Sequence, residues 1–358
     1  SASNMRKYAL FIVILLFIGA VAAAQAEAQN KIKIGVIAYR GHEEAISRWQ
    51  PTAEYLISEI PRHSFVIVPL DLDTIQKAVE RKEVDFVITN PENYVELESG
   101  YGATRIATLK TMYNGTPLSV FGAVIFTRAN RTDITDLRDL KGKTFMAVEE
   151  KSFGGWQMSW REFQDYGIDP FSELAGIEFT GFPQDLVVSG VRDGKADAGT
   201  VRTGLLESMA TEGKINLTDF RILNQQHQED FPQLLSTRLY PEWAFAKVRN
   251  TSDELAEQVV VTLLKMPHNS KAARAAKIKG WTVPLDYQRV HELMMDLRIG
   301  PYKDYGKLTF EDALRNYWYV AVLLIFAIVL SISFIAYVKK TNIMLELRVK
   351  ERTAELEE

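Results

Sequence analysis

The sequence has no cysteine among its 358 residues and few histidines. Without cysteine, the chain can form no disulfide, no thiolate nucleophile and no cysteine metal site. The histidines are scattered and show no metal-binding spacing such as H-E-x-x-H: they are His42, His63, His227, His268 and His291. The sequence therefore predicts no metal site and no cofactor.

Motifs for catalysis and charge for nucleic acid are also missing. The sequence contains no G-x-S-x-G, no Walker A and no G-x-G-x-x-G motif, and no pair of carboxylates stands out at the end of a predicted strand. The formal net charge is −4, and runs of Lys and Arg occur only beside the apolar segments described below. These absences predict a chain that is neither an enzyme nor a partner of nucleic acid.

Long apolar runs are scarce, with one near each end of the chain. The first, residues 9–24, follows Arg6 and Lys7 and ends in small residues that fit the A-x-A cleavage pattern. We interpret residues 5–28 as a secretory signal peptide, with an uncleaved anchor as the alternative. Either interpretation predicts export of the residues that follow.

The second apolar run, residues 317–338, contains 22 residues without a charge. A helix of that length crosses the ~30 Å hydrocarbon core of a membrane. Aromatic residues 317–319 suit one membrane interface, and Lys339 and Lys340 suit the cytoplasmic one under the positive-inside rule. The sequence thus predicts a bacterial inner-membrane protein, single-pass after signal cleavage, with a periplasmic domain and a cytoplasmic C-terminus.

Short apolar runs alternate with amphipathic stretches in the exported part. The first group of predicted strands is 32–38, 65–70, 84–89, 106–109 and 120–126, with helices at 45–59, 73–81 and 91–99. The second group is 144–148, 177–182, 198–201 and 220–223, with helices at 155–166, 184–193 and 204–212. The near-continuous apolar strands and the intervening helices are typical of doubly wound α/β units.

Two such units in tandem predict two lobes. The chain returns through residues 236–248 and closes with helices at 252–265, 270–279 and 284–297. We expect this last part to complete the first lobe, which gives lobe 1 at about 31–122 plus 240–300 and lobe 2 at about 128–234. The chain then crosses between the lobes twice, near residues 122–128 and 234–243, and two crossings make a hinge.

Ligands of such folds bind outside the carboxyl ends of the strands. This rule selects Tyr39 and Arg40 after the first strand, and Thr89 and Asn90 after the third. Asn90 either contributes to the site or serves only as a helix cap. Tyr94, one turn further on, either leans into the cleft or packs in the core.

The most specific candidate is the turn of Ser152, Phe153, Gly154, Gly155 and Trp156. Paired glycines at a strand-to-helix turn let the backbone approach a ligand and offer free N–H groups to an anion, although a flexible turn with a packed tryptophan is the alternative. Arg202 and Arg238 are the cations expected near the cleft, unless they form ordinary surface ion pairs. Arginine binds oxyanions bidentately and aromatic rings cover apolar ligand surface, so we expect a small oxyanion.

Five segments together resemble the phosphonate-binding-protein-like (PhnD-like) branch of type II periplasmic binding proteins, and in particular sensor domains of membrane histidine kinases of the tetrathionate-sensor type. They are KIGVIAYR (33–40), DFVITNPENY (85–94), DLKG (139–142), GKADAGTVRTG (194–204) and STRLYPEW (236–243). The resemblance covers about residues 31–297. It implies a two-lobed clamp that closes on a small ligand through Tyr39, Thr89, Tyr94, the turn at 152–156 and Arg202.

The turn at residues 152–156 departs from the family pattern. Phosphonate binders of the family resemble a Ser/Thr-rich turn followed by a helix, whereas this turn is bulkier and has fewer hydroxyl groups. The departure argues against phosphonate and favours a sulfur oxyanion such as tetrathionate or thiosulfate.

Residues 339–358 carry a heptad-like pattern. The a and d positions are Val338, Asn342, Leu345, Val349, Arg352 and Leu356. The pattern predicts a short coiled coil and hence a homodimer, with a merely amphipathic juxtamembrane helix as the alternative. Residues 351–356 also resemble the signalling helix that precedes PAS or phosphoacceptor domains in histidine kinases.

The expected function is ligand sensing for a two-component histidine kinase, in which lobe closure moves the membrane helix. The catalytic domains, and a response regulator as their partner, would lie outside this sequence. The alternatives are a membrane-tethered binding protein of an ABC transporter and the sensor of a diguanylate cyclase.

Overall fold

The computed structural model describes residues 31–307 and 310–357. These residues fall into two units, one that ends at Lys303 and one that begins at Asp304. The signal peptide predicted for residues 5–28 lies outside the described residues. The first unit contains all the strands of the described chain, and the second contains one long helix.

The larger sheet of the first unit has the strand order β14-β4-β13-β3-β1-β2, with β5 beside β4. Its strands are β1 (Lys31–Ile37), β2 (Ser64–Leu70), β3 (Phe86–Thr89), β4 (Thr104–Tyr113), β5 (Thr116–Leu118), β13 (Ala244–Lys247) and β14 (Ile278–Thr282). Strands β2, β1 and β3 are parallel, whereas β13 is antiparallel to both of its neighbours. The helices of this lobe are α2 (His42–Glu59), α3 (Leu72–Glu80), α4 (Pro91–Tyr101), α9 (Asp253–Leu264), α10 (Lys271–Ala276), α11 (Gln288–Leu297) and the short η4 (Gly300–Tyr302).

The smaller sheet has the order β11-β7-β10-β8-β9. Its strands are β7 (Ala123–Arg128), β8 (Thr144–Ala147), β9 (Gly176–Phe179), β10 (Ala198–Arg202) and β11 (Phe220–Leu223). Strands β10, β8 and β9 are parallel, and β7 is antiparallel to β10 and β11. The helices of this lobe are η1 (Leu137–Leu140), η2 (Phe153–Gln157), α5 (Met158–Asp165), α6 (Pro170–Glu173), α7 (Asp185–Arg192), α8 (Leu205–Thr211) and η3 (Leu217–Asp219).

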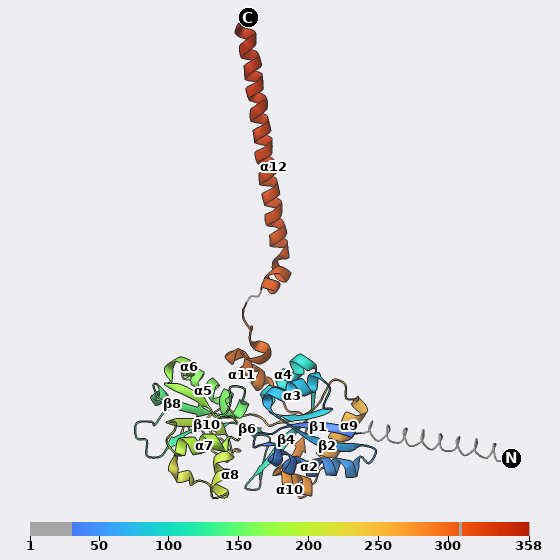
Figure 1. The fold of residues 1–358 in the computed structure, drawn as a ribbon, viewed down its shortest axis with the longest axis vertical. Helices are drawn as coiled ribbons and strands as arrows, with labels where there is room; N and C mark the ends of the chain where they lie inside the picture. Colours follow the sequence, from blue (N-terminus) through green and yellow to red (C-terminus); the bar gives the residue numbers. More distant parts are fainter. Residues whose placement is uncertain (1–30, 308–309, 358) are drawn as a thin grey trace, which may run out of the picture. The chain divides into compact units, whose positions relative to one another are not determined.

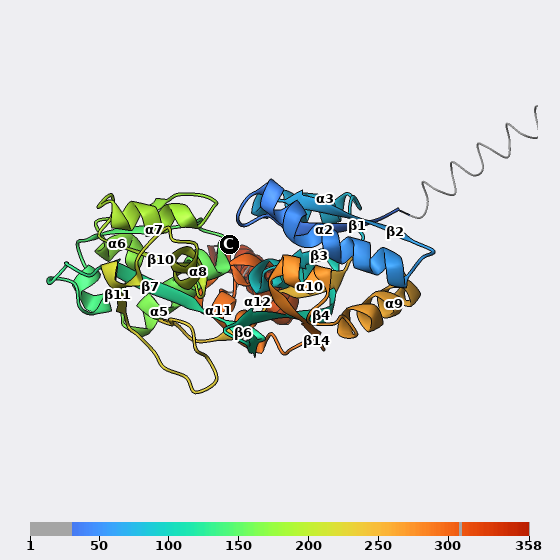
Figure 2. The same cartoon turned by 90° about the horizontal axis from the view of Figure 1, so that it is seen from below.

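Two short strands form a third, two-stranded sheet. β6 (Val120–Phe121) and β12 (Tyr240–Pro241) pair antiparallel with each other. In the chain, β6 lies between a strand of the larger sheet and a strand of the smaller one, and β12 lies on the return path. The chain therefore passes twice between two lobes, which Figures 1 and 2 show on either side of β6. The predicted two-lobed α/β fold is confirmed.

Some details differ from the prediction. The strand expected at residues 120–126 is interrupted at Gly122, because the chain changes sheets there. The helix expected at residues 270–279 ends at Ala276, since Lys277 takes the left-handed conformation (φ 54°) and β14 follows. Both sheets contain parallel and antiparallel strands. The sequence did not predict the antiparallel ones, because a continuous apolar run indicates that both faces of a strand are buried and does not indicate its direction.

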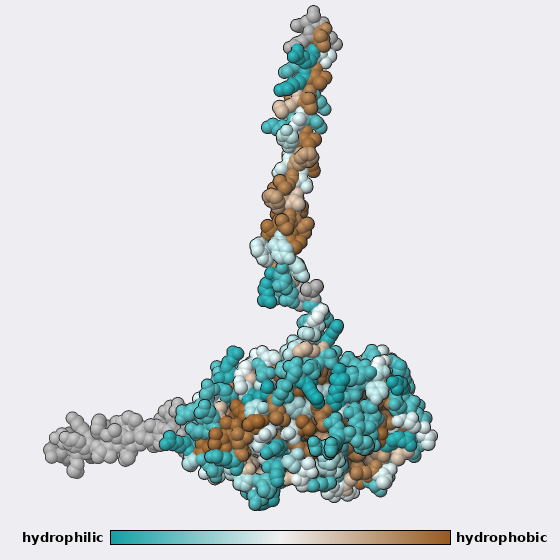
Figure 3. Space-filling model, turned by 180° about the vertical axis from the view of Figure 1, so that it is seen from behind, coloured by the Kyte–Doolittle hydropathy of each residue, from teal (hydrophilic) through white to brown (hydrophobic). Residues whose placement is uncertain are grey.

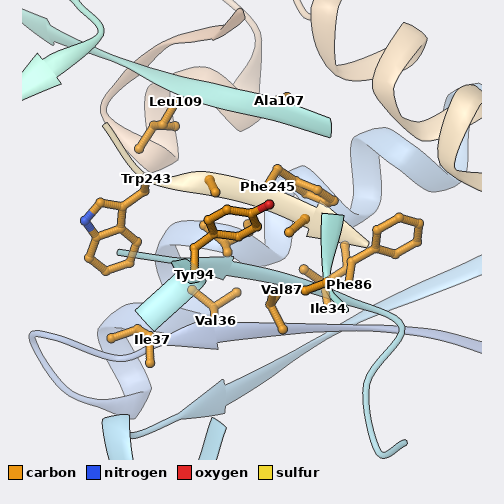
Figure 4. Close-up of a cluster of buried hydrophobic side chains, with 14 of the residues drawn as sticks. Ile34, Val36, Ile37, Phe86, Val87, Tyr94, Ala107, Leu109, Trp243 and Phe245 are labelled. Atoms are coloured by element: carbon orange, nitrogen blue, oxygen red, sulfur yellow. The ribbon is translucent and has the colours of Figure 1, made fainter. Parts of the chain in front are cut away.

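The core of the larger lobe is built between its central strands and helices. Ile34 of β1, Phe86 of β3 and Phe245 of β13 are fully buried there (Figure 4). The rings of Phe86 and Phe245 lie 5.5 Å apart. Burying a side chain of this size contributes about 1.5–3 kcal/mol, so β13, which the chain supplies after its second crossing, is a stabilising part of this lobe.

The second unit consists mainly of α12 (Phe310–Glu357). Its backbone leaves helical geometry at Tyr317 (φ −124°, ψ 19°), the first residue of the predicted membrane span. Within residues 31–307 and 310–357, this is the one helix that is long and apolar enough to cross a membrane. Figure 3 shows apolar side chains around the part of α12 nearer its start, and mixed apolar and polar surface along the rest. The limits of the span stay a prediction.

Candidate ligand-binding site

The carboxyl ends of β1, β3, β8 and β10 meet at a small cavity between the lobes, here called the inner cavity. Its volume is about 20 Å³, which is room for about one water molecule. Its walls are mostly aromatic and uncharged. The lining residues are Ile37, Tyr39, Asn90, Phe121, Ser152, Phe153, Gly154, Phe182, Gln184, Arg202 and Trp243.

Arg202, at the end of β10, is the cation of the inner cavity. Its Nη2 donates to Oε1 of Glu242 at 2.8 Å, and its guanidinium lies 4.7 Å from the ring centroid of Phe121. Glu242 is only 1% exposed, and its Oε2 accepts a bond from the backbone N–H of Trp243 at 3.2 Å. The charge of Arg202 is thus offset by a buried carboxylate from the hinge segment, and the inner cavity as a whole is close to neutral.

The glycine turn of the smaller lobe lies against Arg202. In η2 the N–H of Gln157 donates to the carbonyl of Ser152 at 3.1 Å, five residues back. The four preceding backbone N–H groups, from Phe153 to Trp156, have no hydrogen-bond acceptor among the described residues. A Cβ added at Gly154 would lie 3.0 Å from Cβ of Arg202. Of these four residues, Phe153 and Gly154 line the inner cavity, and Gly154 lies against Arg202. Free backbone donors beside a guanidinium group are an arrangement suited to an anion.

The corresponding turn of the larger lobe is capped by a side chain of its own. Asn90 caps α4, since its Oδ1 accepts a bond from the N–H of Asn93 at 2.9 Å. The hydroxyl of Thr89, fully buried, donates to Oδ1 of Asn93 at 2.9 Å. Asn90 lines the inner cavity and Thr89 does not. Both residues thus have a structural role, and only Asn90 lies where it can also meet a ligand.

Tyr39 and Arg40 both follow β1, but Tyr39 lines the inner cavity and Arg40 contacts the other lobe. The Tyr39 ring forms part of the wall of the inner cavity and packs edge-on against Trp243, with ring centroids 5.5 Å apart. Arg40 lies at the rim and bonds across the cleft to Asp185 at 2.8 Å and to Glu212 at 3.3 Å. Hydrogen bonds from Arg40 and Lys214 lower the pKa of Glu212 to about 2. Arg40 therefore joins the lobes.

Tyr94 lies outside the inner cavity. It is 1% exposed and belongs to the core of the larger lobe, where its hydroxyl donates to Glu98 at 2.7 Å (Figure 4). Burial and this hydrogen bond raise its pKa to about 12. Of the two open alternatives for this residue, the structure has the packed one, because the face of α4 that carries Tyr94 is turned towards Tyr287, with ring centroids 5.4 Å apart.

Trp156 and Arg238 are also away from the inner cavity. Trp156 is fully buried in the smaller lobe and stacks on Trp160, with ring centroids 6.1 Å apart. Arg238 is half exposed, bonds to Asp165 at 2.7 Å and borders a separate polar cavity. Gly155 packs against Val148, so it shapes the turn without lining the cavity.

The sequence analysis missed several residues of the inner cavity. Phe121 and Trp243 come from the two crossing segments, and Phe182 and Gln184 come from the loop after β9. Glu242, which pairs with Arg202, also belongs to a crossing segment. The sequence contained a signal for the residues of the crossing segments. A segment that crosses between two lobes runs along the floor of the cleft between them, so its side chains are candidates for the lining.

Further contacts join the lobes outside the inner cavity. Lys151 of the smaller lobe bonds to Asp73 of the larger one at 2.8 Å, and Arg161 bonds to Asp296 at 2.7 Å. Glu92, at the start of α4, is 2% exposed, and burial together with the neighbouring Glu96 raises its pKa well above the usual range. These contacts hold the two lobes together in the described conformation.

Two α/β lobes that face a common cleft, with a double crossing between them, define a periplasmic-binding-protein fold. A family model described as the periplasmic substrate-binding protein of phosphonate ABC transporters matches residues 34–288. The chain therefore belongs to this family of phosphonate-binding periplasmic proteins. The predicted family and fold class are confirmed.

The chain is also similar to a curated protein and to solved structures. It is 38% identical over 269 residues to the tetrathionate sensor histidine kinase TtrS of Salmonella typhimurium, a match that covers 75% of this chain and 44% of that protein. The chain thus spans less than half the length of this relative. The first unit is accordingly a periplasmic ligand-binding domain homologous to part of a sensor kinase.

Two solved structures share the fold. One is a binding protein of an ABC phosphonate transporter from Pseudomonas aeruginosa, with a TM-score of 0.61, 14% identity, and coverage of 82% of this chain and 95% of that one. The other is PhnD1 from Prochlorococcus marinus in complex with methylphosphonate, with a TM-score of 0.58, 13% identity, and coverage of 75% and 98%. At these identities the likeness concerns the fold alone.

Proposed function

We propose that this chain is the ligand-sensing part of a two-component sensor histidine kinase and that it binds a small oxyanion between its lobes. The observation that carries the ligand class is the pair of free N–H donors at Phe153 and Gly154, which line the inner cavity with Arg202. Donors at a helix start and a guanidinium group both favour a negatively charged oxygen. A sulfur oxyanion such as tetrathionate or thiosulfate is the favoured class.

The aromatic walls support a ligand with a soft, weakly hydrated part. Tyr39, Phe121, Phe153, Phe182 and Trp243 surround the inner cavity. Aromatic faces provide dispersion contacts with polarisable atoms such as sulfur. The 38% identity over 269 residues to a tetrathionate sensor histidine kinase supports the same class.

The inner cavity must enlarge to accept any such ligand. At about 20 Å³ it has room for roughly one water molecule. The lobes therefore bind ligand in a more open arrangement and close onto it. A ligand shifts that equilibrium only as far as its affinity for the two arrangements differs.

Helix α11 is placed to pass lobe movement to the end of the first unit. Its Asp296 pairs with Arg161 of the smaller lobe, and its Arg289 donates to the carbonyl of Leu239 in the crossing segment at 3.3 Å. The helix ends at Leu297, close in sequence to Lys303, where the first unit ends. Opening and closing of the lobes would thus change the contacts of the last helix before the membrane-length segment.

A thermal-shift screen tests the ligand class. The purified chain is heated with tetrathionate, thiosulfate, sulfite, methylphosphonate and phosphite in turn. We expect at least one sulfur oxyanion to raise the melting temperature and Arg202→Ala to abolish that rise. Stabilisation by the phosphorus oxyanions alone would contradict the sulfur class, and an unchanged rise in the Arg202 variant would contradict the assigned site.

A chimaera tests the sensing role. The chain is joined through α12 to the remaining part of the Salmonella kinase, and autophosphorylation is measured in membranes with and without the stabilising oxyanion. Because the chain has no cysteine, Asp73→Cys and Lys151→Cys can be linked selectively by a short bis-maleimide. We expect the linked lobes to give constant output, and ligand-responsive output after linking would contradict signalling by lobe closure.

A further inference from the structure

A second cavity adjoins the inner cavity at the mouth of the cleft, and we call it the outer cavity. Its volume is about 140 Å³. It shares Tyr39 and Arg202 with the inner cavity, so these two side chains lie between the cavities. Its charged lining consists of four cations and one carboxylate: Arg40, Arg48, Arg202, Lys277 and Glu44.

Two of the four cations already have carboxylate partners. Arg40 pairs with Asp185, Glu212 and Glu44. Arg202 pairs with Glu242. Over the described residues, no carboxylate lies within ion-pair distance of Arg48 or Lys277. The outer cavity therefore has an excess of positive charge that the inner cavity lacks.

Arg48 is held in place by contacts that leave donors unused. Its Nη1 donates to the Tyr39 hydroxyl, and its guanidinium lies 5.5 Å from the Tyr39 ring centroid and 5.3 Å from that of Trp49. Its Nε is buried and, within the described part of the chain, has no hydrogen-bond acceptor. Cation–π contacts stabilise a guanidinium group but accept none of its hydrogen bonds. An arginine that lines a cavity and has no carboxylate partner favours an anion in that cavity.

The two sites of positive charge are close to each other. The guanidinium carbon of Arg48 lies 5.5 Å, and that of Arg202 5.9 Å, from the centroid of the same Tyr39 ring. Both arginines thus lie beside the ring that the two cavities share, so a dianion long enough to pass Tyr39 would meet a cation at each end. Lys277, held in the left-handed conformation at the end of α10, adds its charge on the outer side.

We propose that the outer cavity is a second anionic subsite, where Arg48 and Lys277 bind one charged group of an elongated dianion whose other charged group occupies the inner cavity. This inference rests on the proposed function and narrows its ligand from small oxyanions in general to molecules with two separated anionic groups. Glu44 lies one helical turn before Arg48 on α2 and competes with the ligand for Arg48. If its carboxylate rotated away from Arg40, it would form an ion pair with Arg48 instead.

A matched pair of probes tests the subsite. Ethane-1,2-disulfonate carries two sulfonates on a two-carbon chain, and ethanesulfonate carries one on the same chain. Affinities are measured by calorimetry with the full chain in nanodiscs. We expect the disulfonate to bind roughly 10- to 100-fold more tightly, the gain typical of an added charge-assisted hydrogen-bond pair.

Substitutions separate the subsite from the rest of the cleft. Arg48→Ala should remove most of the preference for the disulfonate and leave ethanesulfonate binding unchanged, while Lys277→Ala should remove a smaller part. Arg48→Lys keeps the positive charge but loses the two-pronged guanidinium group, so its preference for the disulfonate should be intermediate. Arg62→Ala, at an exposed arginine elsewhere in the same lobe, is the control, and the melting temperature of each variant shows that it is folded.

The outcomes distinguish this inference from the proposed function. Equal affinity for the two probes, or equal loss of both in Arg48→Ala, overturns the subsite and leaves the oxyanion cleft intact. A disulfonate preference that survives Arg48→Ala and disappears in Arg40→Ala would also overturn it. Binding of neither probe, together with no response to any oxyanion of the thermal-shift screen, overturns the proposed ligand class and the subsite with it.

Discussion

The two strand-to-helix turns on the two sides of the cleft differ in sequence and in what they offer a ligand. In the larger lobe, the Asn90 side chain accepts a bond from the N–H of Asn93, and the Thr89 hydroxyl donates to the Asn93 side chain. In the smaller lobe, the turn at residues 153–156 leaves four N–H groups without acceptors among the described residues. A helix start at the end of a strand is thus a ligand site only where no side chain has already capped it.

The two turns also meet. Glu92, two residues beyond Asn90, packs towards Gln157, the residue that ends η2, and a hydrogen bond between them partly opposes the upward shift in the pKa of Glu92. Oε1 of Gln157 is buried and has no hydrogen-bond donor among the described groups. A protonated Glu92 could supply that donor. The capped turn thus carries a buried carboxyl group with a raised pKa, while the uncapped turn carries the N–H groups without acceptors among the described residues.

The largest expected effect comes from removing the cation beside the uncapped turn. Arg202→Ala leaves Glu242 buried without its partner, which should lower the free energy of unfolding by about 3–5 kcal/mol and abolish oxyanion binding. Adding Glu242→Gln should restore much of the stability and none of the binding. Chemical denaturation and calorimetry measure the two effects separately.

Arg238→Ala is the matched control, because this arginine has a half-exposed ion pair with Asp165 away from the inner cavity. This substitution should lower the free energy of unfolding by about 0–1 kcal/mol, which is the usual contribution of an exposed ion pair. An Arg238 variant that loses as much stability or binding as the Arg202 variant would contradict the contrast between the two arginines.

The second effect comes from the paired glycines. A Cβ at Gly155 would lie 2.5 Å from Cγ2 of Val148 and 2.5 Å from Oγ of Ser152, so Gly155→Ala should cost about 1–3 kcal/mol of stability through overpacking. A Cβ at Gly154 would instead lie 3.0 Å from Cβ of Arg202 and 3.1 Å from the Phe121 ring. Gly154→Ala should therefore reduce ligand affinity more than stability. The reverse ranking in paired melting and binding measurements would refute the roles given to the two glycines.

Much of the fold was predictable from local sequence. The strand predicted at residues 32–38 is β1, and the helix predicted at 91–99 is α4, because their apolar spacing and the Asn90–Pro91 cap act locally. Strand β14 was not predicted, since it begins at Ile278 directly after a left-handed Lys277 and inside an apparently continuous helical pattern. Its strand state depends on pairing with β4, about 170 residues earlier in the chain.

The site was predictable only where a single segment determines it. Tyr39, Asn90, Ser152 to Gly154 and Arg202 each follow a strand, and the carboxyl-end rule found them. Glu242 was missed because its importance comes from a partner 40 residues away. Tyr94 and Trp156 were expected at the ligand because both lie in the first turn of a helix, but only packing decides which face of that turn looks into the cleft.

The third effect concerns pH and the contact between the turns. Burial, then Glu96, raises the pKa of Glu92 above its usual 4.5 in the folded chain. The folded state therefore holds a proton that the unfolded chain releases, so stability is fully present below the usual pKa and falls as pH rises towards the folded value, by up to about 1.4 kcal/mol per pH unit. Glu92→Gln should flatten this slope in denaturant titrations between pH 5 and 8, whereas Glu80→Gln, at an exposed site of the same lobe, should not. Burial also raises the pKa of Glu96, Glu162 and Glu207, so part of the slope should remain. A slope in Glu92→Gln equal to that of the unchanged chain would contradict the role of Glu92.

The smallest effect tests whether the self-capped turn is only structural. Asn90→Ala removes the acceptor for the N–H of Asn93 and should cost about 1 kcal/mol of stability. Asn90→Ser keeps a capping oxygen and should restore that stability. If the turn of the larger lobe contributes nothing but its cap, oxyanion affinity should be unchanged in both variants. A serine variant with normal stability and weakened binding would show that the amide of Asn90 itself contacts the ligand, and the two turns would then share the site instead of dividing its roles.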